Sequence, residues 1–137
     1  GRFPEALAAW DSCARVSVNP DLQVATQYWR YLVLARMGNK VGADSALAIA
    51  RANPPLIENM AYLRLLRLYA GLESVESVYP GVATANVSDA TTAYGVSMWH
   101  VLNGRRDEAR ALWKQLDASP AWASFGVLAA EAELTRR

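Results

Sequence analysis

The sequence predicts an all-α protein whose antiparallel helix pairs stack into a solenoid of about eight helices. Its 137 residues include 25 alanines and 16 leucines but only 12 valines and 2 isoleucines, a mixture that favours helix over sheet. Gly38, Gly71 and Gly104 follow one another at intervals of 33 residues, a period typical of helix–turn–helix repeats. Because a single helical hairpin cannot bury its apolar face alone, we expect neighbouring hairpins to stack.

Each helix is predicted from its apolar spacing and from the residues that start and end it. Glycine ends several of them, because it adopts the left-handed conformation that closes a helix. Proline stops others, because the residue before it avoids the helical region. Asn19 or Asp21 is expected to cap the second helix, and Ser88 the sixth. The eight predicted helices cover residues 4–15, 21–37, 41–52, 55–70, 73–79, 89–103, 106–116 and 121–135.

The chain is long enough for one domain. The 33-residue period divides that domain into the second half of one unit, three further units and a terminal helix. The unit at 56–87 is degenerate, because Pro80 cuts its second helix short and an irregular stretch, 81–86, follows. The terminal helix is expected to cap the stack with a polar outer face. The predicted boundaries are 1–20, 21–55, 56–87, 88–120 and 121–137.

Composition and charge exclude several classes of protein. The formal net charge of +1 argues against a nucleic-acid partner held by electrostatics over a whole face. One histidine and one cysteine cannot build a zinc site of the usual kind, so we expect no metal and no cofactor. No apolar run is long enough to span a bilayer, so no membrane insertion is expected. The sequence leaves open whether the compartment is the cytoplasm or a bacterial periplasm or envelope.

The repeating residues resemble those of the tetratricopeptide repeat family. Gly38, Ala43, Leu47, Ala50 and Pro55 match the family's spacing of a turn glycine, small and large apolar positions and a closing proline. The segments beginning at Gly1 and Gly104 follow the same pattern, whereas the degenerate unit has Glu76 where the family has alanine. The resemblance implies a right-handed solenoid that acts as a scaffold and binds proteins. The chain is also similar to tetratricopeptide proteins of the bacterial envelope, some of which are lipoproteins.

The resemblance further implies a concave groove, lined by the first helix of each unit. An arginine- and tyrosine-rich groove would suit a peptide of another protein that carries acidic groups. A mixture of core and rim positions is the alternative interpretation of the same residues. The candidate groove residues are Tyr28, Leu32, Arg36, Ala61, Arg64, Leu65, Arg67, Tyr94 and Met98.

Two other functions remain as alternatives to a non-enzymatic binding module. One is a regulatory or substrate-presenting domain of a larger enzyme or transcription regulator, because the first helix of the first unit is absent before Gly1. The other is a small helical enzyme that uses His100 as a base, with Ser97 three residues earlier on the same face. Five tryptophans exceed what a helical core needs, so any of Trp29, Trp99 and Trp122 that is exposed would favour self-association into a homo-oligomer.

Overall fold

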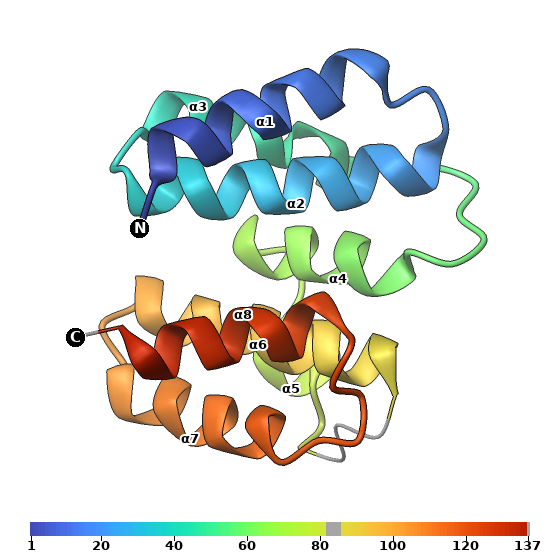
Figure 1. Cartoon of the computed structure of the whole chain (residues 1–137). Coiled ribbons are helices and arrows are strands. Elements are labelled where there is room, and N and C mark those ends of the chain that lie inside the picture. The colour runs from blue at the N-terminus through green and yellow to red at the C-terminus, as the bar shows by residue number, and fades with distance from the viewer. Residues whose placement is uncertain (82–85, 137) are drawn as a thin grey trace. The chain divides into compact units, whose positions relative to one another are not determined.

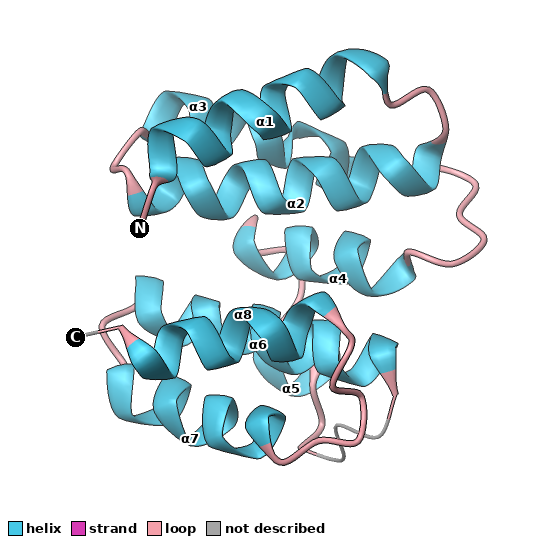
Figure 2. Ribbon diagram, in the orientation of Figure 1, coloured by secondary structure: helices cyan, strands magenta, loops and turns pink. Residues whose placement is uncertain are grey.

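The computed structural model describes residues 1–81 and 86–136, and helices dominate that part of the chain (Figures 1 and 2). Its elements are eight α-helices and one 3-10 helix, with no strand among the described residues. Consecutive helices pack as neighbouring pairs, which confirms the predicted all-α class. The right-handed winding stays a prediction.

The chain forms two compact units, Gly1–Glu73 and Ser74–Arg137. The boundary between these units falls inside the segment expected to be a degenerate unit, 56–87, and the predicted division of a single domain into repeat units stays a prediction. Most of the irregular stretch expected at 81–86 lies outside the described residues.

In the first unit, α2 lies at the centre and packs against α1, α3 and α4 (Figure 1). Leu34 of α2 packs with Ala43 and Ala46 of α3 in a buried cluster, which Leu7 of α1 and Tyr31 also contact. The elements of this unit are α1 (Phe3–Val16), α2 (Pro20–Arg36), α3 (Lys40–Ala46), the 3-10 helix η1 (Leu47–Arg51) and α4 (Met60–Tyr69).

Side-chain caps and a glycine turn set the ends of α2 and α3. The side chain of Asn19 accepts a hydrogen bond from the Leu22 N–H at 2.8 Å, so Asn19 rather than Asp21 caps α2. Gly38 has a φ of 73°, as expected for a glycine that closes a helix. Asn39 then caps α3 by accepting from the Gly42 N–H at 2.9 Å. The predicted helix 41–52 is thus present, but it changes to 3-10 geometry after α3.

Asp21 instead organises the segment that precedes α4. Its carboxylate accepts hydrogen bonds from the backbone N–H groups of Ile57, Glu58 and Asn59, at 3.0, 2.9 and 2.7 Å. These three bonds hold the segment in a non-helical path, so α4 begins at Met60, later than the predicted start at 55. They also lower the pKa of Asp21, because each stabilises the ionised carboxylate.

In the second unit, each of the three long helices, α6, α7 and α8, packs against the other two. Gly126 of α8 lies so close to the backbone carbonyl of Ala90 in α6 that no side chain fits between them. Asn86 caps α6 by accepting from the Asp89 N–H at 2.9 Å, which corrects the prediction that Ser88 does so. The elements are α5 (Val75–Val78), α6 (Val87–Leu102), α7 (Arg106–Asp117) and α8 (Phe125–Thr135).

The exposed side of the terminal helix and of the segment before it carries large apolar side chains as well as polar ones. Trp122 before it, and Phe125 and Leu128 within it, are 73, 68 and 48% exposed. These apolar side chains were expected to face the stack, and the capping role of 121–137 stays a prediction. None of the helices in the described part of the chain has the length and hydropathy of a membrane-spanning segment.

Candidate functional site

The apolar residues predicted to line a groove in the first unit are largely core residues. Tyr28 and Leu65 are 0% exposed, and Leu32 is also buried. The ring of Tyr28 lies 5.0 Å from that of Tyr62, centroid to centroid. At these positions of α2 and α4, large side chains therefore fill the interior, while the small Ala61 is half-buried.

The three arginines of the predicted groove have partners within the first unit. The guanidinium of Arg36 lies over the ring of Phe3, 4.9 Å from its centroid. Arg64 forms an ion pair with Glu73, with Nη2 and Oε2 3.0 Å apart.

Arg67 tethers α4 to the end of η1. Its guanidinium donates to the backbone carbonyls of Ala50 and Ala52, at 3.2 and 3.1 Å, and to the side chain of Asn53 at 2.6 Å. Every one of these acceptors is neutral, so the charge of Arg67 is left uncompensated.

The last two predicted groove residues, Tyr94 and Met98, lie on α6 and are buried. They belong to the second compact unit, whereas the other seven belong to the first. A groove shared by all nine residues stays a prediction.

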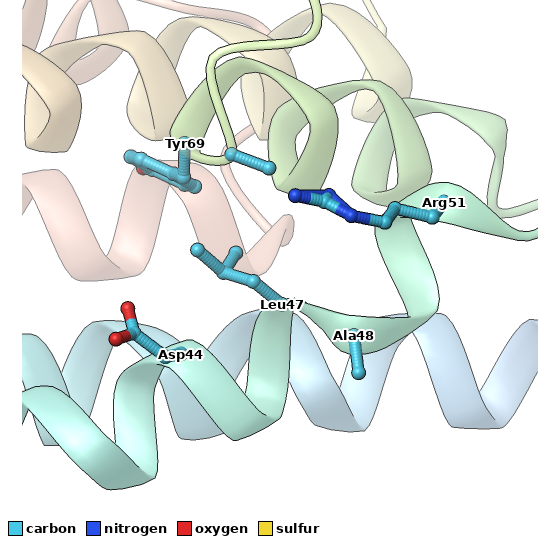
Figure 3. A pocket seen from close by; sticks show the side chains of 6 residues that line it. Asp44, Leu47, Ala48, Arg51 and Tyr69 are labelled. Carbon is cyan, nitrogen blue, oxygen red and sulfur yellow. The ribbon is translucent and has the colours of Figure 1, made fainter.

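The first unit carries a hollow of about 360 Å³ on its surface, shown in Figure 3. Leu47 lies between Asp44 and Arg51, with the guanidinium of Arg51 extending toward Leu47 and the ring of Tyr69 opposite. Its lining residues come from α3, η1 and the end of α4 and are Asp44, Leu47, Ala48, Arg51, Tyr69 and Ala70.

Contacts behind the hollow hold its walls in place. The rings of Tyr69 and Tyr31 lie 4.6 Å apart, centroid to centroid. Burial raises the pKa of Tyr31, and the nearby charge of Asp44 raises it further, so the Tyr31 phenol remains neutral. The bonds that Arg67 donates to carbonyls on both sides of Arg51 fix the backbone from which the Arg51 side chain extends.

The charges around the hollow do not balance. Lys40 neutralises Asp44, since Nζ and Oδ2 are 2.8 Å apart. Arg51 is exposed, and within residues 1–81 and 86–136 no carboxylate pairs with either Arg51 or Arg67. The arrangement places the side chains of Leu47 and Tyr69 among polar groups, with an uncompensated cation at one side. It is suited to binding an anionic, partly apolar group.

Sequence reasoning places Lys40, Asp44 and Arg51 on a solvated face and Leu47 on an apolar stripe facing the core. It does not group them as a site, because the hollow depends on the change to 3-10 geometry after Ala46 and on Tyr69 of α4. The one available signal is the spacing, since Asp44 and Arg51 are seven residues apart and flank Leu47 and Ala48.

His100 lies near the end of α6, and its Nδ1 atom is buried without a hydrogen-bond partner among the described residues. Burial lowers the pKa of His100; the charge of Glu108 opposes this shift and that of Arg105 adds to it. The hydroxyl of Ser97 donates to the Tyr94 carbonyl at 2.6 Å and accepts from Trp113 Nε1 at 2.7 Å. Ser97 is thus engaged elsewhere, and the described contacts do not join it to His100 as a nucleophile–base pair.

Within the described part of the chain, no group of three or more histidine, cysteine, aspartate or glutamate side chains could hold a metal ion. Comparison of the chain with protein-family models, with curated proteins and with solved structures gives no match.

Proposed function

We propose that this chain is a non-catalytic interaction module of the tetratricopeptide type, which binds a peptide segment of another protein. The hollow of Figure 3 carries the proposal, because it places the side chains of Leu47 and Tyr69 beside Arg51, which has no carboxylate partner among the described residues. Apolar anchoring together with a few charge-assisted bonds is how helical modules commonly hold peptides. The hollow replaces the concave groove as the expected contact surface, since the apolar groove candidates of the first unit are mostly buried.

A selection from a displayed random peptide library tests this function. Selected peptides are titrated into the ¹⁵N-labelled chain, and amide shifts are mapped. We expect the shifts to concentrate at residues 44–51 and 69–70, where the hollow lies. Failure to enrich any peptide, or shifts confined to other surfaces, would contradict the proposal.

A pair of matched variants separates binding in the hollow from nonspecific adhesion. Ala48 is exposed and lines the hollow, so Ala48→Trp fills the space without removing a core side chain. Ala111 is equally exposed but lies on α7 of the other unit, so Ala111→Trp adds the same ring elsewhere. We expect Ala48→Trp to abolish peptide binding and Ala111→Trp to leave it unchanged. Equal binding by both variants would place the peptide site outside the hollow.

A further inference from the structure

We infer that the hollow between α3, η1 and α4 takes a peptide residue that combines an apolar side chain with a nearby carboxylate, with the carboxylate directed toward Arg51. The inference rests on the proposed function, because it names the partner's chemistry at the same surface.

The size of the hollow and the apolar side chains among its lining residues can accommodate one apolar side chain of a ligand. A volume of about 360 Å³ is at the lower end of the range for small-ligand pockets, so it suits one or two residues and not a folded partner. Four of the lining residues have apolar side chains or rings, namely Leu47, Ala48, Tyr69 and Ala70. An aromatic or leucine side chain would bury its apolar surface against them.

The charges select a carboxylate as the second feature of the ligand. Arg51 has no hydrogen bond or ion pair within the described residues, so its guanidinium is available for a two-pronged bond to a carboxylate. Arg67, tethered beside it to neutral oxygens, adds a second positive charge. Because Lys40 already neutralises Asp44, the surroundings of the hollow are positive overall.

The positions of the charges also fix the ligand's orientation. Seven residues separate Asp44 from Arg51, which corresponds to about 10–14 Å along α3 and η1. Leu47 lies between them, so an apolar side chain can occupy the middle while a carboxylate reaches Arg51. A carboxylate at the other side would find no free cation among the described residues, because Lys40 there is already paired with Asp44.

Two small probes that differ only in charge test this inference. N-acetyl-L-phenylalanine carries an aromatic side chain and a carboxylate, whereas its carboxamide carries the same ring without the charge. Each probe is titrated at pH 7 and low salt into the ¹⁵N-labelled chain. We expect the acid to shift the amides of residues 44–51 and 69–70 and to bind about 5–10 times more tightly than the amide. Added salt should remove this difference.

Three variants test which charged side chains cause the preference for the acid over the amide. Arg51→Gln should lower the affinity for the acid to that for the amide while leaving the amide's affinity unchanged. Arg110→Gln, which removes an exposed arginine from α7, should leave both affinities unchanged. Asp44→Asn should strengthen binding of the acid, since it leaves Lys40 without its carboxylate partner and makes the surroundings of the hollow more positive. Circular dichroism should show all three variants folded, because these side chains are exposed.

Equal affinity for acid and amide, no effect of Arg51→Gln, or weaker binding in Asp44→Asn would overturn the carboxylate inference. An absence of shifts in the hollow with either probe, up to its solubility limit, would overturn it as well. The proposed function fails by a different result, namely when library-selected peptides do not shift the amide signals of the residues that line the hollow. A peptide that binds the hollow with no preference for a carboxylate would leave the proposed function standing.

Discussion

The hydroxyl of Ser97 joins α6 to α7 in the interior of the second unit, and its removal should destabilise that unit. Trp113 Nε1 donates to this oxygen at 2.7 Å, and Ser97 and Trp113 are 0 and 8% exposed. Ser97→Ala therefore leaves a buried indole N–H without an acceptor, which costs about 1–3 kcal/mol. The better helix propensity of alanine offsets at most about 0.5 kcal/mol of this cost. We expect the free energy of unfolding to fall by about 1–2 kcal/mol.

Urea unfolding followed by far-ultraviolet circular dichroism measures this loss, with a separate midpoint for each unit where the two unfold independently. Ser12→Ala is the matched control, because Ser12 also donates to a backbone carbonyl and accepts from a side chain, but on the exposed face of α1. It should change stability by less than about 0.5 kcal/mol. Repeating Ser97→Ala in a Trp113→Phe background, which lacks the donor, should reduce the cost. The reasoning fails if Ser97→Ala is as stable as the parent protein.

Other expectations concern packing, pH and self-association. Gly126→Ala places a methyl group against the Ala90 carbonyl and should destabilise the second unit by about 1–3 kcal/mol in the same urea assay; an unchanged midpoint would refute the close approach. The pKa of Asp21 is lowered in the folded state, so its contribution to stability is complete above the ordinary value of 3.8 and is lost as the pH falls below it. Asp21→Asn should therefore flatten this part of the pH–stability profile, and an unaltered profile would refute the role of its three backbone bonds. The exposed Trp122 and Phe125 should make the chain associate weakly with itself; sedimentation should show less association for Phe125→Glu, and a parent chain that stays monomeric at all concentrations would refute this.

The sequence predicts best those parts of the fold that local chemistry determines. Turns close at Gly38 and Gly104, with φ values of 73° and 76°, because glycine adopts this conformation without strain. Helices α2, α6 and α7 follow the apolar spacing of their own residues, and their ends lie within two residues of the predicted ones. These local signals are enough to predict the all-α class and the packing of helices in neighbouring pairs.

Prediction fails where a distant side chain decides the local backbone. The start of α4 depends on Asp21, which lies 36 to 38 residues from the N–H groups that it binds. The end of η1 is held by Arg67, which lies 14 to 17 residues away. The apolar spacing within a single helix carries no information about either of these long-range contacts. The expected start at residue 55 is therefore five residues early.

The candidate site depends even more on tertiary packing. The resemblance to tetratricopeptide repeats predicts that Tyr28 and Leu65 line a groove. In the structure both side chains are buried and fill the interior of the first unit. Arg67, predicted to line the groove, donates to the backbone at the end of η1 and so supports the neighbouring Arg51. The hollow beside Arg51 arises only when η1 and the end of α4 are brought together.

The measurement that tests the central claim most directly is an amide-shift map of the ¹⁵N-labelled chain with a library-selected peptide, recorded for the parent chain and for Ala48→Trp. An interaction module of the proposed kind should show saturable shifts at residues 44–51 and 69–70 in the parent chain and none in the variant. Shifts at those residues that persist in Ala48→Trp, or saturable binding that leaves them unmoved, would contradict the claim that this hollow holds the partner.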